Sequence, residues 1–104
     1  MKSIALSELK NHFDEEITIS GFVDEVRNLK WVQFVVLRDA TGKVQITIEK
    51  SEEKNKELVE IVDNLAVEST IKVTGTIMES PKVKLNGMEL IPSTIEVTSK
   101  NEGE

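Results

Sequence analysis

One stretch of the sequence, residues 21–45, holds side chains whose types and order suit the binding of unpaired nucleic-acid bases. Val35 and Leu37 share one face of the strand predicted there, so Phe34 belongs to the opposite face. Gln45 follows on the next predicted strand, with basic side chains between the two. An exposed ring beside amide and basic groups can stack on and read single-stranded bases. From the residues alone, burial of Phe34 in the core is an equally good interpretation.

Two charged neighbours of Phe34 are predicted to be structural rather than to read bases. Arg38 can pair with a carboxylate, and Asp39 is placed to cap a turn that ends at Gly42. We therefore assign neither side chain to the candidate binding site.

No catalytic or metal-binding signature occurs in the sequence. The chain has no cysteine, which excludes disulfides, thiolate metal sites and a cysteine nucleophile. Phosphate-binding glycine loops, serine-hydrolase motifs and His-Glu-x-x-His motifs are missing. His12 is solitary, and adjacent carboxylates such as Glu15 and Glu16 diverge in direction and make poor acid–base pairs. We expect no catalytic residue, no metal site and no cofactor in this chain.

The charge balance limits the partners that the chain can take. With 19 acidic and 13 basic residues the formal net charge is −6, which opposes non-specific binding to a phosphate backbone. A nucleic-acid role must then depend on a local basic patch and on contacts to bases. Basic residues do gather near the candidate stretch and in one later segment: Arg27, Lys30, Arg38, Lys43, Lys82 and Lys84.

Size and hydropathy predict one soluble domain. A chain of 104 residues with 38 % apolar and 31 % charged residues can build a single modest core. No apolar run approaches the roughly 20 residues of a membrane span. The first residues lack the apolar core of a secretion signal. We expect a cytoplasmic protein with no membrane contact.

The apolar periodicity predicts five strands and two helices. Alternating apolar residues predict strands at residues 17–23, about 31–38, 44–48, 71–77 and 88–97, the last interrupted near Pro92. The spacing of Leu6, Leu9 and Phe13 predicts a short N-terminal helix. A helical stripe predicts a second helix over residues 51–65, which Ser51 can cap.

The order of these elements is that of a mostly β, five-stranded OB-fold, a Greek-key barrel. Its helix lies between strands three and four, and the short N-terminal helix precedes the barrel. A mixed α+β sheet with the same element order is also compatible. We assign residues 1–16 to the N-terminal helix and lead-in, residues 17–98 to the OB-fold domain and residues 99–104 to a disordered tail.

Two segments resemble a known family. The first reads Gly21-Phe22-Val23, Arg27-Asn28-Leu29, Phe34-Val35, Leu37-Arg38-Asp39, Gly42 and Gln45, and the second reads Pro81-Lys82-Val83-Lys84 and Gly87-Met88-Glu89-Leu90-Ile91-Pro92. Over about residues 17–97 the chain resembles the N-terminal anticodon-binding OB-fold domain of archaeal-type aspartyl-tRNA and asparaginyl-tRNA synthetases. The family's catalytic domain, which uses ATP and Mg²⁺, follows this module, and none of it is present. We expect no aminoacylation by this chain.

The resemblance implies a role for each matching residue. Phe34 stacks on the middle anticodon base, a uracil, and Gln45 hydrogen-bonds the edge of that base. Glu89 also contacts the anticodon bases, and Arg27 lies near the first base or its phosphate. Without the resemblance, Gln45 and Glu89 would pass as ordinary solvated strand residues.

The chain departs from the family pattern at two places. Lys30-Trp31 replaces a glycine-rich turn, so Trp31 adds a stacking surface or blocks the approach of RNA, although such a residue is more often a half-buried loop anchor. Asp24 stands where archaeal-type members carry a tryptophan that helps select the third anticodon base, and its charge would repel a phosphate. Lys84, the other residue implicated at that base, is kept, and with Lys82 it would lie near phosphates.

The partner expected from these residues is the anticodon loop of a tRNA. A generic single-stranded nucleic-acid binder is one alternative, which the acidic balance opposes. A protein-interaction module that has lost RNA binding is the other, with a homodimer or another protein as partner. Asp24, Trp31 and the net charge favour this last class to some degree.

Overall fold

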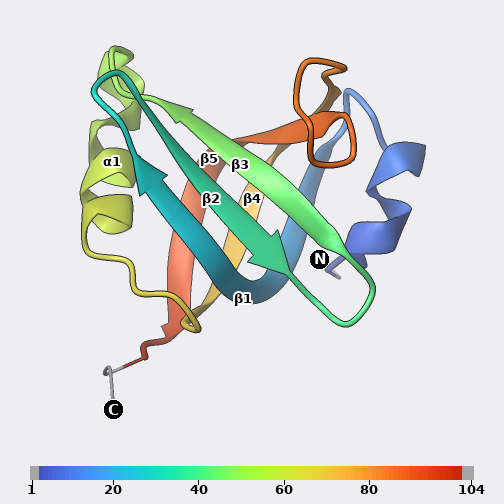
Figure 1. Ribbon diagram of the computed structural model, residues 1–104, viewed down its shortest axis with the longest axis horizontal. Coiled ribbons are helices and arrows are strands. Elements are labelled where there is room, and N and C mark those ends of the chain that lie inside the picture. Colours follow the sequence, from blue (N-terminus) through green and yellow to red (C-terminus); the bar gives the residue numbers. More distant parts are fainter. Residues whose placement is uncertain (1–2, 102–104) are drawn as a thin grey trace.

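A computed structural model, which describes residues 3–101, shows five strands that close into a barrel (Figure 1). The strands are β1 (Glu16–Asn28), β2 (Val32–Arg38), β3 (Lys43–Glu49), β4 (Thr70–Glu79) and β5 (Met88–Ser99), closed in the order β1-β2-β3-β5-β4. The 3-10 helix η1 (Leu6–Asn11) precedes the barrel, and η2 (Glu53–Asn55) with α1 (Lys56–Asp63) joins β3 to β4. The predicted OB-fold is thus confirmed, and because the sheet closes on itself, the alternative α+β arrangement with the same element order is wrong.

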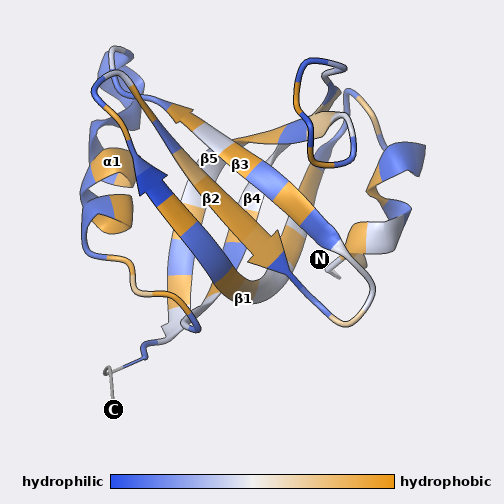
Figure 2. Ribbon diagram, in the orientation of Figure 1, coloured by the Kyte–Doolittle hydropathy of each residue, from blue (hydrophilic) through white to orange (hydrophobic). Residues whose placement is uncertain are grey.

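The alternation of side chains along each strand fills the barrel with aliphatic residues. In β2, Val35 and Leu37 are fully buried, while Phe34, Val36 and Arg38 face outward and are partly exposed. The same alternation of hydrophobic and hydrophilic residues is visible along β3 in Figure 2. Because inward side chains come from every strand, one continuous core holds the barrel together and fixes which residues face outward.

The long strand β1 is shared between two neighbours. Its first half pairs with β4 and its second half with β2, and Phe22 is paired with both. Gly21 sits at the change of partner, where a Cβ atom would lie 2.4 Å from the carbonyl oxygen of Arg38. Only glycine allows this approach of the two backbones, which bends β1 around the barrel.

The pairing of β4 with β5 contains a second close approach. A Cβ atom on Gly75 would lie 2.3 Å from the carbonyl oxygen of Ile91, and the register shifts between Thr74 and Gly75, opposite Pro92. The interruption predicted near Pro92 is therefore an irregularity inside one continuous β5 rather than a break.

The helix between β3 and β4 is shorter than the predicted range 51–65. Residues Glu53–Asn55 form a 3-10 turn, and Ser51 does not cap α1. Asn55 instead donates a hydrogen bond from Nδ2 to the carbonyl oxygen of Glu49 at 2.9 Å, which ties the start of α1 to the end of β3. The predicted apolar stripe is present, since Leu58 and Val62 are buried against the barrel.

The ends of the described chain pack onto the barrel. Leu6 and Leu9 of η1 are buried, so the predicted N-terminal helix exists as a 3-10 helix. The predicted tail starts later than residue 99, because Ser99 is the last residue of β5 and Asn101 donates its backbone N–H to Ser69 Oγ at 3.0 Å. The rest of the predicted tail, residues 102–104, lies outside the described residues. Over residues 3–101, no helix is long and apolar enough to span a membrane.

Candidate nucleic-acid interface

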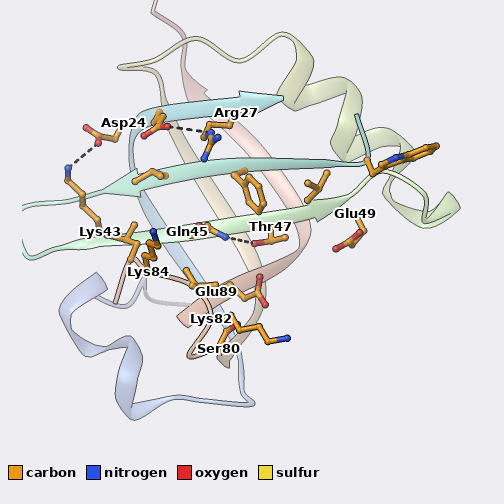
Figure 3. Close-up of a pocket in the computed structure, with 17 residues that line it drawn as sticks. Asp24, Arg27, Lys43, Gln45, Thr47, Glu49, Ser80, Lys82, Lys84 and Glu89 are labelled. Carbon is orange, nitrogen blue, oxygen red and sulfur yellow. Dashed lines mark hydrogen bonds and ion pairs between the residues drawn. The ribbon is translucent and has the colours of Figure 1, made fainter. Parts of the chain in front are cut away.

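An open groove of about 770 Å³ runs over the outer faces of β2 and β3 (Figure 3). Figure 3 shows Asp24 and Arg27 of β1 on one side, the lysines of the β4–β5 loop on the other, and Gln45 and Thr47 between them. All of the predicted binding residues line this groove: Arg27, Trp31, Phe34, Gln45, Lys82, Lys84 and Glu89. Residues from distant parts of the sequence are thereby brought to one surface.

The centre of the groove is built from neighbouring positions on three strands. Phe34 on β2 is paired with Thr47 on β3, which makes Gln45 its diagonal neighbour, at about 7–8 Å between backbones. Gln45 is in turn paired with Glu89 on β5. A partly exposed ring, an amide and a carboxylate thus lie within reach of one flat ligand.

The Gln45 amide is held in one orientation. Its Nε2 donates a hydrogen bond to Thr47 Oγ1 at 3.1 Å, and Thr47 is almost fully buried. Within residues 3–101 the Gln45 side chain makes no other hydrogen bond, so its carbonyl oxygen and second N–H are open to a ligand. The group can therefore accept and donate at the same time.

Asp24 does not present an uncompensated negative charge. Its carboxylate lies 3.1 Å from Lys43 Nζ and 3.4 Å from Arg38 Nε. Two cations share this carboxylate, which weakens the phosphate repulsion expected from the sequence. The same contact also reduces the charge that Lys43 offers to a ligand.

Arg38 is structural, as predicted. Its Nη2 lies 2.7 Å and 2.9 Å from the two carboxylate oxygens of Glu68, and its guanidinium carbon lies 5.1 Å from the centre of the Phe22 ring. Together with the Asp24 contact, these interactions join β1, β2 and the segment before β4. Arg38 does not line the groove.

Asp39 caps the β2–β3 turn, which confirms its predicted role. Its Oδ1 accepts hydrogen bonds from the backbone N–H groups of Thr41 and Gly42 and from Thr41 Oγ1, and its Oδ2 accepts one from the Leu6 N–H. Burial raises the pKa of the Asp39 carboxyl, but these hydrogen bonds outweigh burial and hold that pKa below its usual value.

The basic side of the groove is carried by the β4–β5 loop. Lys82 and Lys84 are exposed, and neither forms an ion pair with any residue in the 3–101 range. Asn86 fixes this loop, because its Nδ2 donates to the carbonyl oxygen of Lys43 at 3.0 Å. This role of Asn86 was not predicted from the sequence. The one available signal was the Asn-Gly pair, which is typical of a turn, and Asn86 does adopt the left-handed backbone, with a φ of 60°.

Two further residues that were predicted to bind nucleic acid, Arg27 and Trp31, lie at the edges of the groove. Arg27 is exposed, and its nearest carboxylate is Glu25 at 4.0 Å, a long contact in a solvated setting. Trp31 is 65 % exposed, so its interpretation as a half-buried loop anchor is wrong. In the described chain, no group of three His, Asp or Glu side chains is arranged to hold a metal ion.

The closed barrel and the groove on its outer face define an OB-fold domain. Residues 17–98 match the family described as the OB-fold nucleic acid binding domain, and the chain belongs to that family. It is 44 % identical over 88 residues to an aspartate–tRNA(Asp/Asn) ligase of Methanopyrus kandleri, covering 85 % of this chain and 20 % of that protein. The predicted kinship with the anticodon-binding domain of these ligases is confirmed.

Solved structures agree with this assignment. The aspartyl-tRNA synthetase of Entamoeba histolytica matches with a TM-score of 0.85 and 28 % identity, over 100 % of this chain and 23 % of that one. An OBody bound to hen egg-white lysozyme matches with a TM-score of 0.84 and 19 % identity, over 97 % and 99 % of the two chains, and shows the shared fold alone. The chain spans about a fifth of the length of the curated relatives it matches.

Proposed function

We propose that this domain binds the anticodon loop of a tRNA in the groove over β2 and β3. One observation carries the proposal: four kinds of side chain line the same groove. They are the ring of Phe34, the amide of Gln45, the carboxylate of Glu89 and the ammonium groups of Lys82 and Lys84 in the β4–β5 loop, which are unpaired within residues 3–101. Recognition of single-stranded RNA needs this combination, because splayed bases are stacked on aromatic rings and read along their edges.

Phe34 and Gln45 have different roles at the middle base: Phe34 stacks on the base and Gln45 selects it. The ring supplies stacking, which contributes about 1–3 kcal/mol per base and tolerates any sequence. The Gln45 amide supplies the choice of base, because uracil presents an N3–H donor beside the O4 acceptor. The free Gln45 oxygen accepts from N3–H while the free N–H donates to O4. Cytosine reverses both groups and is disfavoured.

Glu89 reads a neighbouring base. Its carboxylate only accepts hydrogen bonds, so it favours a base edge with an amino or ring N–H group. It also keeps phosphates away from the centre of the groove. The phosphates are bound instead at the edges, by Arg27 on one side and by Lys82 and Lys84 on the other.

The charge of the groove favours base reading over generic strand binding. The carboxylates of Asp24, Glu25, Glu49 and Glu89 balance the cations of Arg27, Lys43, Lys82 and Lys84. A generic binder gains most of its affinity from phosphate contacts and depends steeply on salt. This domain therefore gains its affinity from bases and shows a shallow salt dependence.

The class of tRNA follows from the relatives. Their names give tRNA(Asp/Asn) or tRNA(Asp) as the substrate of the ligase, and we propose a tRNA of that group, with uracil in the middle of its anticodon, for this chain. Ligation of an amino acid belongs to the remaining four-fifths or so of those proteins, to which these 104 residues do not correspond.

Removal of one ring tests the proposal. The Phe34→Ala variant should bind an anticodon stem-loop with a middle uracil about tenfold or more weakly than the unchanged chain. Phe22→Ala is the matched control, because Phe22 is also an outward-facing strand phenylalanine but does not line the groove. Titration of fluorescein-labelled RNA measures both variants, and equal affinities would contradict the stacking role.

A further inference from the structure

We propose that Trp31 is a second stacking platform, which binds a base outside the three anticodon bases. The groove then takes a single-stranded segment of about four or more nucleotides, within the range usual for OB-folds. The inference rests on the proposed function, because it extends the same groove beyond Phe34.

The exposure of Trp31 is the first observation. Large apolar side chains that are exposed elsewhere on the described chain, such as Phe22, Val67 and Ile91, lie outside the groove. Trp31 is 65 % exposed and is the one member of that group that lines the groove. A flat indole continuous with a ligand groove offers a stacking surface that an isolated apolar residue does not.

The backbone that carries Trp31 is fixed. Its carbonyl oxygen accepts a hydrogen bond from the Lys50 N–H at 2.9 Å, and the Leu29 N–H donates to the carbonyl oxygen of Val32 at 2.9 Å. Lys50 Nζ also donates to the carbonyl oxygen of Leu29 at 2.7 Å. The indole is thus presented on a closed turn, and little ordering of that turn is required when a ligand binds.

A hydrogen-bond network anchors this turn to the interior. Lys50 Nζ donates to Asn28 Oδ1 at 2.7 Å, and Asn28 Nδ2 donates to Asp63 Oδ1 at 2.6 Å. Gln33 Nε2 donates to the same Asp63 oxygen at 2.9 Å, and Gln33 is fully buried. The turn between β1 and β2 is therefore tied to α1 and to the barrel through polar groups.

The separation along the chain places the two rings on different bases. Trp31 lies in the β1–β2 turn, three residues before Phe34 on β2, and three residues of extended chain span about 10 Å. Stacked nucleotides rise about 3.4 Å each, so about three steps separate the two bases, and a partly extended strand still needs about two. An anticodon extends only one nucleotide to either side of its middle base. The base on Trp31 consequently flanks the anticodon.

The charge next to the indole suits a nucleotide. Lys30 Nζ lies 5.2 Å from the centre of the Trp31 ring, a cation–π distance. The ammonium lies over one face of the ring, so a base would stack on the opposite face while the ammonium charge attracts the phosphate of the same nucleotide. An apolar protein partner would gain nothing from this lysine.

Tryptophan emission tests the inference directly. The sequence holds one Trp and no Tyr, so the intrinsic emission reports on Trp31. Addition of the anticodon stem-loop with a middle uracil should quench this emission at the concentrations that give binding. By anisotropy of labelled RNA, Trp31→Ala should bind about tenfold more weakly, Trp31→Phe should retain most of the affinity, and Val67→Ala should bind unchanged.

Abasic RNA locates the base. A set of stem-loops is prepared, each of which lacks the base at one of the loop positions on either side of the anticodon. Each stem-loop is titrated into the unchanged chain and into Trp31→Ala. At one of these positions the unchanged chain should lose about tenfold in affinity, and Trp31→Ala should lose nothing further.

The outcomes separate the two proposals. If RNA binds and depends on Phe34, while the Trp31 emission and the affinity of Trp31→Ala stay unchanged, the inference is overturned and the proposed function stands. If no RNA binds, both fail. If the emission shifts with protein concentration alone, Trp31 is a contact between copies of the chain, and the inference is overturned.

Discussion

Gln45 on β3 and Glu89 on β5 are direct partners in the short parallel pairing that closes the barrel. Within residues 3–101, one further pair, Ile46 with Leu90, supports this pairing. The two side chains proposed to read base edges are thus placed by barrel closure and not by any local motif. Contacts that hold β3 and β5 together also set the shape of the binding site.

Gln45 should control the choice of the middle base. In Gln45→Ala the affinity for a stem-loop with a middle uracil should fall about five- to tenfold, because two hydrogen bonds are lost. The affinity for the cytosine version should change little, so the ratio between the two approaches one. Thr47→Val, which removes the partner of Gln45 Nε2, should act in the same direction but less strongly. Competition titrations measure the ratio, and an unchanged ratio in Gln45→Ala would refute edge reading.

Asp24 should weaken RNA binding, because its carboxylate occupies the Lys43 ammonium. Asp24→Asn removes the carboxylate 3.1 Å from Lys43 Nζ, which frees that ammonium for a phosphate. The affinity for RNA at low salt should rise about two- to fivefold, and the slope of log K against log salt should steepen by up to about one. Glu68→Gln is the control, because Glu68 pairs with Arg38 but lies outside the groove. Weaker binding of Asp24→Asn would show that Asp24 contributes to binding.

Asp39 should make stability depend on pH in the acid range. The pKa of its carboxyl is lower in the folded chain than usual, so its contribution is complete above the ordinary value of about 3.9 and is lost as the pH falls through the lower folded value. Asp39→Ala should reduce the free energy of unfolding by about 1–3 kcal/mol at pH 7. That difference should narrow below about pH 4.

Urea unfolding at several pH values measures this effect. Glu57→Ala, which removes an exposed carboxylate of α1, is the control and should leave the unfolding curves close to those of the unchanged chain. A difference between Asp39→Ala and the unchanged chain that stays constant down to pH 2 would contradict the capping role.

Gly75 should be intolerant of any side chain. In Gly75→Ala the new Cβ would lie 2.3 Å from the Ile91 carbonyl oxygen and 2.7 Å from Pro92 Cα, so β4 and β5 must separate. We expect a loss of about 1–3 kcal/mol or more in the free energy of unfolding. Gly42→Ala is the matched control, since a Cβ atom on Gly42 would lie 3.8 Å from the backbone N of Ser7, an ordinary contact distance. This variant should change the free energy of unfolding by about 0.5 kcal/mol or less. Equal curves for the two variants in denaturant unfolding would contradict the close approach.

The features that follow from local pattern were predictable from the sequence. The period of two in β2 placed Phe34 opposite Val35 and Leu37, and a carboxylate three residues before Gly42 predicted the cap by Asp39. The element order predicted the barrel. The binding roles of Gln45 and Glu89 were predicted only from the resemblance to the family. Taken alone, each is an ordinary polar residue of a strand and carries no physical signal of base binding.

Features that depend on distant contacts were not predictable. The bond from Asn86 to Lys43 and the bond from Gln33 to Asp63 each join residues at least 30 positions apart. Neither has a local sequence signature. The exposure of Trp31 was predicted wrongly for a related reason: it lies in a turn, where alternation no longer indicates which side chains are buried.

The central claim is that Phe34 stacks on the middle anticodon base, and a double-mutant cycle tests it most directly. The unchanged chain and Phe34→Ala are each titrated with a stem-loop that carries uracil at the middle position and with one that is abasic there. If the ring stacks on that base, Phe34→Ala weakens binding about tenfold or more on the uracil loop and leaves it nearly unchanged on the abasic loop. An equal loss on both loops would contradict the account.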